Sequence, residues 1–252
     1  MKPVLSPNLP SSRVKAALIG CDTDKEIILS LEGQGIEPVL VPECADLPLP
    51  LRSHADMLCY HMGGGNILLY QGVEKALGTR LAELGFKVAI SSARLDACYP
   101  GDAALNAARV EGRIFCNPST ISREILVIIS ESDLTLIPVR QGYARCSICA
   151  VDKSSVITSD SGIADAAEEN GLDVLRIRPG YIKLSGYAYG FIGGACGKCA
   201  SDRLCFAGRI EGHPDYESIR SFCAHRGVEA VSLSSCDLTD IGGILPLTQE
   251  ET

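Results

Sequence analysis

The segment Cys196-Gly-Lys-Cys199-Ala-Ser-Asp202 has a counterpart fifty residues earlier, Cys146-Ser-Ile-Cys149-Ala-Val-Asp152. Either the four cysteines hold a metal ion, or one structural unit has been duplicated. In an extended strand, residues three apart point to opposite faces, so each pair would chelate a metal only across a tight turn. The similarity also continues past the cysteines, which duplication explains and metal binding does not. We therefore expect a repeat protein, with no bound metal and no cofactor.

The amino-acid composition limits the partners and the location to be expected for this protein. The chain has 252 residues, of which 46% are hydrophobic, and a formal net charge of -8. That charge disfavours nucleic-acid partners, because such binding depends on Lys and Arg neutralising phosphates. No stretch reaches the length of a membrane span, and the first residues do not resemble a signal peptide. We expect a cytoplasmic location, no membrane partner, and twelve cysteines that are mostly reduced, buried thiols.

The second half of the chain shows one unit clearly. Residues 143–151 and 156–158 are predicted to form two strands of a hairpin, because Asp and Ser at 152–155 favour a turn. A helix is predicted over 160–170, since Asp160 or Ser161 can cap its start and Gly171 can end it. Residues 174–178 are apolar and β-branched enough for a third strand. The unit is therefore strand, strand, helix, strand.

The same order recurs along the chain. A strand over 54–62, for example, opens a unit that aligns without gaps to the hairpin described above. The unit at the N-terminus lacks one hairpin strand, which residues 241–247 can supply, closing a ring and removing a sheet edge. The predicted units are about 14–53, 54–96, 97–141, 142–185 and 186–240.

These units define the fold class. A small sheet with one helix cannot bury both faces alone, so the units are expected to stack into a single domain over residues 1–252. The prediction is an α/β propeller of five ββαβ units with pseudo-five-fold symmetry, closed by the C-terminal strand. An ordinary doubly wound α/β sheet is the alternative, but it would place single strands rather than hairpins between helices.

Five such units in a ring resemble the pentein fold. This is the fold of the guanidine-modifying enzymes, which include arginine and agmatine deiminases, dimethylarginine hydrolases and amidinotransferases, and of a ribosome anti-association factor without known catalysis. Gly63-Gly-Gly-Asn66 and Gly193-Gly194 are similar to Gly-Gly segments of the deiminases. The hairpins over 103–118 and 143–158 are at least as similar to those of the ribosome factor. The resemblance therefore implies the fold but leaves the branch open.

The closing strand bears on catalysis. In the deiminases this strand carries a nucleophilic cysteine shortly after a glycine run, and the matching segment here is Asp240-Ile-Gly-Gly-Ile-Leu-Pro246-Leu-Thr-Gln249. The cysteine position falls on Pro246, or on Leu247 if the register slips by one, and neither can act as a nucleophile. No His-x-Asp string is found in the region where the enzymes hold their histidine. The covalent mechanism of the family is therefore not expected here.

The repeats also nominate a ligand site. The overlay places Tyr60, Asn106, Cys149 and Cys199 at one position of four units, with Asp240 near the fifth. The first strands of the pentein fold line its central pore, so these side chains are candidates for binding a small polar molecule. The alternative is that they point into the sheet cores, because a strand has two faces.

Further candidates lie in turns. His61 is beside the glycine run 63–65, and Asp102 precedes a pore strand, although each is also explained as an ordinary turn residue. The segment 181–189 contains three tyrosines and one glycine and is expected to cover one mouth of the pore.

These features predict a function class. We expect a non-hydrolytic protein that binds a small polar molecule or a protein partner at the pore. One alternative is a hydrolase or transferase that acts on a guanidino or amidine compound through a displaced cysteine. The other is a protein-binding scaffold like the ribosome factor.

Overall fold

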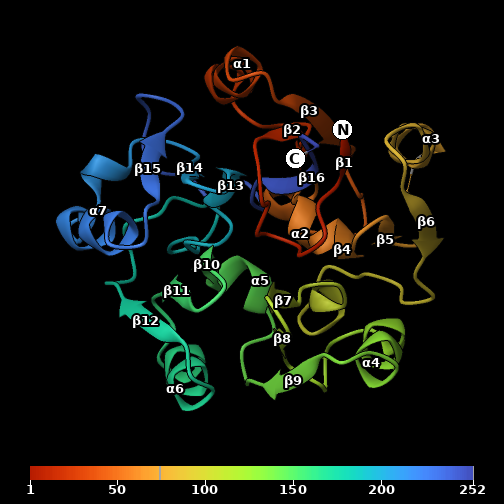
Figure 1. The fold of residues 1–252 in the computed structure, drawn as a ribbon. Helices are drawn as coiled ribbons and strands as arrows, with labels where there is room; N and C mark the ends of the chain where they lie inside the picture. Colours follow the sequence, from red (N-terminus) through yellow and green to blue (C-terminus); the bar gives the residue numbers. More distant parts are fainter. Residues whose placement is uncertain (74, 252) are drawn as a thin grey trace.

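The computed structural model describes residues 1–73 and 75–251, so residues 74 and 252 of the predicted domain lie outside the described residues. The described residues form five small sheets arranged in a ring around a common centre (Figure 1). The helices α1, α3, α4, α6 and α7 lie on the outside of this ring. The predicted ββαβ propeller is confirmed. The exact unit boundaries and the extent of the single domain stay predictions.

The strands and helices have the following bounds. The strands are β1 (Lys2–Pro3), β2 (Val14–Gly20), β3 (Glu37–Val41), β4 (Cys59–Gly63), β5 (Asn66–Leu69), β6 (Lys87–Ile90), β7 (Ala108–Val110), β8 (Arg113–Cys116), β9 (Thr135–Pro138), β10 (Cys149–Asp152), β11 (Ser155–Thr158), β12 (Asp173–Arg176), β13 (Cys196–Ala200), β14 (Arg203–Phe206), β15 (Glu229–Ser232) and β16 (Leu245–Gln249). The α-helices are α1 (Lys25–Gly33), α2 (Ala55–Leu58), α3 (Lys75–Glu83), α4 (Arg123–Ser130), α5 (Ala144–Ser147), α6 (Ser161–Glu169) and α7 (Tyr216–Ala224). Short 3₁₀ turns are η1 (Leu49–Leu51), η2 (Gly101–Ala103) and η3 (Ile210–Gly212).

Each unit has the same internal order. The hairpin strands β10 and β11 are antiparallel, and β11 is parallel to β12, which follows after α6. The side chain of Asp160 accepts a hydrogen bond from the backbone N–H of Ile163 and so begins α6, as the sequence predicts. The outer helices attach to the sheets through apolar residues four positions apart, which lie on one helix face. These buried pairs are Ile27 and Leu31, Leu77 and Leu81, Ile125 and Ile129, Ile163 and Ala167, and Ile219 and Cys223.

The C-terminal strand closes the ring. β16 pairs antiparallel with β2, and β1 adds to its other edge, so both ends of the chain share one sheet. The strand begins at Leu245 rather than at residue 241, because Gly242 and Gly243 have positive φ angles of 75° and 80° and turn the chain before it. Pro246 pairs with Ala17 inside this strand, and a register shift follows it.

The predicted equivalence of Cys149 and Cys199 is wrong. Cys149 pairs with Ile157, the third residue of β11. The third residue of β14 is Cys205, and it pairs with Gly197, whereas Cys199 lies at the bulge near the end of β13. The alignment of the two sequence segments therefore differs by two residues from the alignment of the strands themselves. Equal spacing of cysteines in the two segments does not fix which residues oppose each other in a hairpin.

Asn106 also does not occupy the predicted ring position. It precedes β7, and Ala108 takes the place opposite the third residue of the second strand. Tyr60 pairs with Leu68 in the second unit and does match Cys149. Of the four residues predicted to be equivalent, only Tyr60 and Cys149 share a register position.

Gly197 lies where an inner strand contacts the closing segment. A Cβ added to it would lie 1.9 Å from the carbonyl oxygen of Ile244. We expect Gly197→Ala to lower the free energy of unfolding by about 3 kcal/mol, because the clash is with backbone that cannot rotate away. Urea unfolding would measure it. Gly78→Ala in α3 is the control, since nothing lies within 4 Å of its added Cβ, and an unchanged midpoint for Gly197→Ala would contradict the close contact.

Candidate functional site

Short helical turns precede two of the inner strands and orient the side chains at the centre of the ring. The predicted strands over 54–62 and 143–151 are wrong in their first halves, which form α2 and α5. In α2 the backbone N–H groups of Met57 and Leu58 both donate to the carbonyl of His54. A turn of helix places consecutive side chains around an axis rather than on alternate faces. Residues that a strand would separate can therefore converge.

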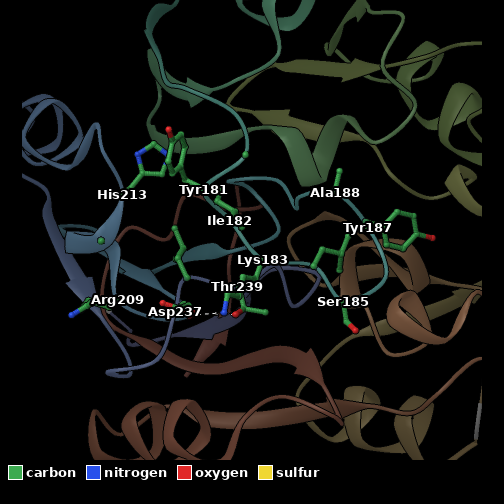
Figure 2. A pocket seen from close by; sticks show the side chains of 14 residues that line it. Tyr181, Ile182, Lys183, Ser185, Tyr187, Ala188, Arg209, His213, Asp237 and Thr239 are labelled. Atoms are coloured by element: carbon green, nitrogen blue, oxygen red, sulfur yellow. Dashed lines mark hydrogen bonds and ion pairs between the residues drawn. The ribbon is translucent and has the colours of Figure 1, made fainter.

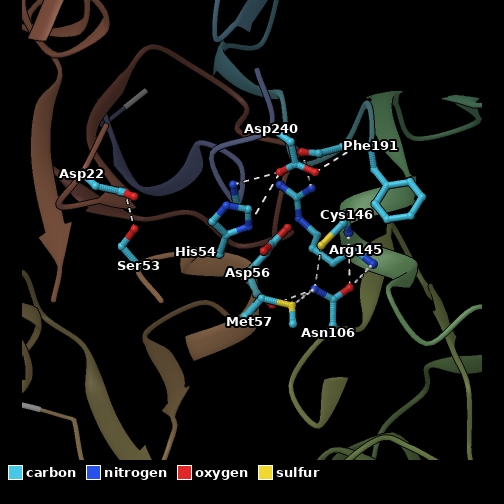
Figure 3. Close-up of polar contacts among 12 residues, drawn as sticks. Asp22, Ser53, His54, Asp56, Met57, Asn106, Arg145, Cys146, Phe191 and Asp240 are labelled. Atoms are coloured by element: carbon cyan, nitrogen blue, oxygen red, sulfur yellow. Dashed lines mark hydrogen bonds and ion pairs between the residues drawn. The ribbon is translucent and has the colours of Figure 1, made fainter. Parts of the chain in front are cut away.

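Five polar side chains from distant parts of the sequence meet at this centre (Figure 3). They are contributed by four segments: α2 and the residue before it, the start of the third unit, α5, and the loop before β16. Each of the five is no more than 4% exposed. The residues are His54, Asp56, Asn106, Cys146 and Asp240.

Asn106 connects three units. Its side-chain oxygen accepts from the backbone N–H of Arg145 at 2.8 Å and of Cys146 at 3.3 Å. Its amide nitrogen donates to the carbonyl of Asp56 at 3.0 Å and contacts the sulfur atoms of Met57 and Cys146 at 3.2 and 3.0 Å. The amide therefore fixes the ends of α2 and α5 relative to each other, and with them the Cys146 thiol.

Asp240 is held by backbone donors. Its carboxylate accepts from the N–H of Phe191 at 2.9 Å and of Gly242 at 3.1 Å. His54 Nδ1 lies 3.8 Å from one of its oxygens. Burial raises the pKa of Asp240, and the nearby His54 partly opposes that rise. Gly242 makes the arrangement possible, because any side chain there would meet the backbone of His54.

Asp56 is buried without a partner. The residue is 1% exposed, and neither carboxylate oxygen has a hydrogen-bond partner among the described residues. In Figure 3 its carboxylate points toward the space between His54 and Cys146. The guanidinium of Arg145, which is also buried, donates to the carbonyl of Gly193 instead. Two carboxylates, those of Asp56 and Asp240, thus converge on one place.

Cys146 is the thiol of this cluster. Burial raises its pKa, the negative charges of Asp56 and Asp240 and the contact of the thiol with the Asp56 carboxylate raise it further, and the hydrogen bond from Asn106 lowers it. The thiol is therefore protonated at neutral pH in the ligand-free protein. A ligand that neutralised the two carboxylates would therefore remove part of this increase in the pKa of Cys146.

A cavity of about 240 Å³ opens above the cluster. Its polar side chains include His54, Cys146 and Asp240, and the rest of its wall is aromatic or aliphatic. A second cavity of about 340 Å³ meets the first at His54, Leu184 and Asp240. The predicted cover segment 181–189 contributes to the first cavity. The residues that line it are Leu51, His54, Met57, Tyr143, Cys146, Leu184, Tyr187, Ala188, Tyr189, Phe191 and Asp240.

Three predicted ligand residues lie in hydrophobic cores instead. Tyr60 is 4% exposed and packs in the core cluster around the second unit. Cys149 lies in a core cluster with Cys196, and Cys199 in another with Cys205. Their side chains are accounted for by packing, since free cysteine behaves as a small hydrophobe.

Asp102 lies beside the cavity wall. The hydroxyl of Tyr143 donates to one of its oxygens at 2.7 Å, and the other oxygen is buried without a partner among the described residues. Burial raises the pKa of Asp102. Its predicted role in binding a ligand stays a prediction, as do those of Tyr60, His61, Asn106, Cys149, Cys199 and Asp240.

His61 lies in a separate part of the molecule. It borders a void of about 20 Å³ together with Arg109 and Arg145, and its ring packs edge-on against Phe86. Its Nδ1 accepts a hydrogen bond from the backbone N–H of Gly63 at 3.0 Å. The structure thus places His61 away from the cavity, in a site that favours the neutral ring.

Stability should depend on pH through His61. Burial, with a smaller effect of Arg109, lowers its pKa from 6.5 to about 4. Between those values the unfolded chain binds a proton that the folded protein does not, so stability falls as the pH decreases through this window. We expect the His61 contribution to be about 2 kcal/mol smaller at pH 5 than at pH 7.

The measurement is the difference in urea unfolding between the native chain and His61→Asn, whose side-chain oxygen can still accept from Gly63. The raised pKa values of Asp102 and Asp240 act in the opposite direction, but they are present in both proteins and cancel. Parallel pH profiles for the two proteins would contradict the assignment.

The structure also bears on metal binding and on membrane insertion. Within residues 1–73 and 75–251, no three His, Cys, Asp or Glu side chains are placed to hold a metal ion. In the same part of the chain, none of the helices combines the length and the apolar character needed to span a bilayer.

A family model described as "Family of unknown function (DUF6873)" matches residues 18–245. The chain belongs to this family. The matched range includes His54, Asp56, Asn106, Cys146 and Asp240, so the whole polar cluster lies within it. A search of the curated proteins found no match.

Solved structures with the same fold are enzymes by their titles. An inosamine-phosphate amidinotransferase from Streptomyces griseus has a TM-score of 0.62 at 9% identity, with 99% of this chain and 98% of that chain covered. An agmatine deiminase from C. jejuni has a TM-score of 0.59 at 9% identity, covering 100% and 97%. An amidinotransferase of the saxitoxin pathway from Microseira wollei has a TM-score of 0.56 at 11% identity, covering 98% of both chains. At these identities the likeness establishes the pentein fold and nothing finer.

The cluster residues that were not expected from the sequence left a visible signal there. His54-Ala-Asp56 is a His-x-Asp string, but it lies in the second unit, outside the region in which such a string was expected. Cys146 was interpreted through its partner in the Cys-x-x-Cys pattern rather than by itself. Only the helical turns α2 and α5 bring these residues to the ring centre.

Proposed function

We propose that the central cavity binds the planar cation of a guanidino or amidine compound and that Cys146 attacks its central carbon. The observation that carries the proposal is the carboxylate of Asp56, which is buried beside Cys146 and Asp240 without an ion-pair partner among the described residues. An unpaired buried charge is costly, so such a site favours a cationic ligand.

The geometry suits a flat cation with several donors. A guanidinium presents N–H groups in a fixed plane and pairs with carboxylates through two parallel hydrogen bonds. Asp56 and Asp240 come from different segments and converge on one space, so they can bind different edges of the same ion (Figure 3). Cys146 and Asp240 line the cavity, and the carboxylate of Asp56 lies beside them in the same cluster (Figure 3). The central carbon would then face the thiol.

Binding would also activate the nucleophile. The pKa of Cys146 is raised partly by the charges of Asp56 and Asp240. A bound cation offsets those charges and thereby favours the thiolate. His54 lines the same cavity and can accept the thiol proton. The reactive form would therefore arise only when the substrate is present.

The reaction follows in two balanced steps. The thiolate adds to the amidine carbon and a C–S bond forms. The C–N bond then breaks, and the amine or ammonia leaves with the proton that His54 holds. Water, deprotonated by His54, adds to the same carbon, the C–S bond breaks, and a urea or amide product is released. An amine in place of water would give amidino transfer.

The comparisons support the class of reaction. The structures of similar fold are titled agmatine deiminase and amidinotransferase. The expected non-hydrolytic binding protein receives no support from them, whereas the alternative of an enzyme with a displaced cysteine is compatible. Pro246 occupies the closing strand here, so the nucleophile would come from α5 in the fourth unit.

A thermal-shift screen with released ammonia and amines measured in parallel tests the proposal. The probes are methylguanidine, butylguanidine, phenethylguanidine, benzamidine, agmatine and arginine. We expect at least one to raise the Tm and to be consumed. The Asp56→Asn variant should lose the shift, because it removes the unpaired charge while keeping the shape. If none of these cations raised the Tm of the native chain and none was consumed, the proposal would be overturned.

A further inference from the structure

Resting on the proposed function, we propose that the compound bound here carries its cationic group on an uncharged aromatic or apolar tail and has no carboxylate. The inference concerns the part of the ligand that lies away from Asp56 and Cys146. It is carried by the chemistry of the cavity wall.

Aromatic rings form much of that wall. Tyr143, Tyr187, Tyr189 and Phe191 all line the cavity. The ring of Phe191 lies 6.3 Å from that of Tyr143 at a tilt of 30°, and 6.2 Å from that of Tyr189 in an edge-on contact. Such rings bury apolar surface and favour offset or edge-on packing with a further ring. They offer little to an anionic tail.

The aromatic wall extends to the outside of the molecule. Tyr187 and Tyr189 are 46% and 41% exposed, whereas Cys146 at the other side of the cavity is 4% exposed. A ligand that reaches Cys146 with its cationic end would therefore lay its tail along these tyrosines toward the solvent. Large half-exposed aromatic side chains beside a cavity are typical of surfaces that contact a ligand.

The cavity lacks a partner for an anion. Among the described residues, neither the aromatic cavity nor the second cavity that joins it is lined by any Lys or Arg. Arg145 lies in the central cluster, where its guanidinium donates to the carbonyl of Gly193, but it lines the void near His61 rather than either of these cavities (Figure 3). A carboxylate on the tail would lie near Asp240 in a site of low polarity, where like charges repel strongly. An α-amino acid such as arginine is therefore disfavoured.

Cationic side chains line a neighbouring groove instead (Figure 2). This groove, of about 670 Å³, is lined by Lys183 and Arg209 among others. Lys183 is already paired with Asp237 at 2.6 Å. Leu184 and Tyr187 line both the groove and the aromatic cavity, so the covering segment separates the two. An anionic tail would have to pass this segment to reach the groove.

The second cavity is lined by acidic side chains. Asp22, Asp24 and Asp237 line it, and they would attract an amine tail such as that of agmatine. Each already has a partner: Ser53 donates to Asp22, the N–H of Glu26 donates to Asp24, and Lys183 pairs with Asp237. The aromatic rings line the cavity that holds Cys146, and Tyr187 and Tyr189 remain half-exposed beside it, so the tail is assigned to them.

Isothermal titration of the full chain with matched guanidines tests the inference. Phenethylguanidine has an aromatic tail, butylguanidine an apolar one, agmatine an amine and 4-guanidinobutyrate a carboxylate. We expect phenethylguanidine to bind at least about 10-fold more tightly than agmatine and about 100-fold more tightly than 4-guanidinobutyrate. Phe191→Ala should weaken the binding of phenethylguanidine by about 10-fold and that of methylguanidine by much less, since methylguanidine has no tail to contact the ring. Tyr181→Ala, which lies in the other groove, is the matched control.

The outcomes separate the inference from the proposed function. Tightest binding by agmatine would assign the tail to the acidic cavity, and tightest binding by 4-guanidinobutyrate or arginine would assign an anion site. Either result overturns the inference and leaves the proposed function intact. No binding by any guanidine, methylguanidine included, would overturn both.

Discussion

Replacing Cys146 with alanine is expected to reduce turnover of the best guanidino or amidine substrate by at least about 10³-fold, because no other group would form the C–S bond. Binding should change by less than about 3-fold, since Asp56 and Asp240 hold the cation and the thiol contributes little to that attraction. The thiol hydrogen-bonds with Asn106, and alanine fits the same space with a smaller side chain.

Three measurements distinguish this role from a structural one. Steady-state kinetics and titration calorimetry separate turnover from binding. Cys116→Ala is the matched control, because Cys116 is also fully buried but lies on β8 away from the cavity, and its activity should stay within 2-fold. Mass spectrometry of the native chain during turnover should detect a substrate-derived adduct on Cys146. Full activity of Cys146→Ala, or an adduct on a different cysteine, would refute the assignment.

The fold could be predicted because its signals are local. Alternating apolar residues, a turn of Asp and Ser, a capping Asp160 and a terminating Gly171 define a unit within about forty residues of sequence. Repetition of that unit then fixes the ring, and the missing strand of the first unit points to the C-terminus. None of these steps requires knowledge of which side chains oppose each other.

The site could not be predicted in the same way, because it depends on register. A strand that shifts by one residue exchanges its two faces, so a side chain can be placed only when the register is known. Cys199 lies two residues beyond the position of Cys149, although both hairpins have a bulge near the same turn. The helical turns α2 and α5 had no strong local signal, since apolar residues surround them. Asp240 and Asn106 were nominated for a shared position in the repeat, yet they meet through hydrogen-bonded turns that only the closed ring assembles.

Asn106→Leu is expected to lower the free energy of unfolding by about 3–5 kcal/mol, among the largest effects of a single substitution. The side chain is fully buried, and its oxygen accepts from two backbone N–H groups at the start of α5. Leucine has a similar volume but cannot accept, so the N–H groups of Arg145 and Cys146 would be buried without partners. The carbonyl of Asp56 would lose its donor as well.

The comparison with an exposed asparagine makes this prediction decisive. Asn66→Ala in the β4–β5 turn removes one long contact, of 3.5 Å to the carbonyl of Gly63, and should change stability by less than about 0.5 kcal/mol. Chemical unfolding in urea gives both values. If Asn106→Leu were as mild as Asn66→Ala, the amide would not connect α2 to α5, and the position of the Cys146 thiol would need another explanation. If it is severe, the residues that hold the nucleophile in place also hold three units of the ring together.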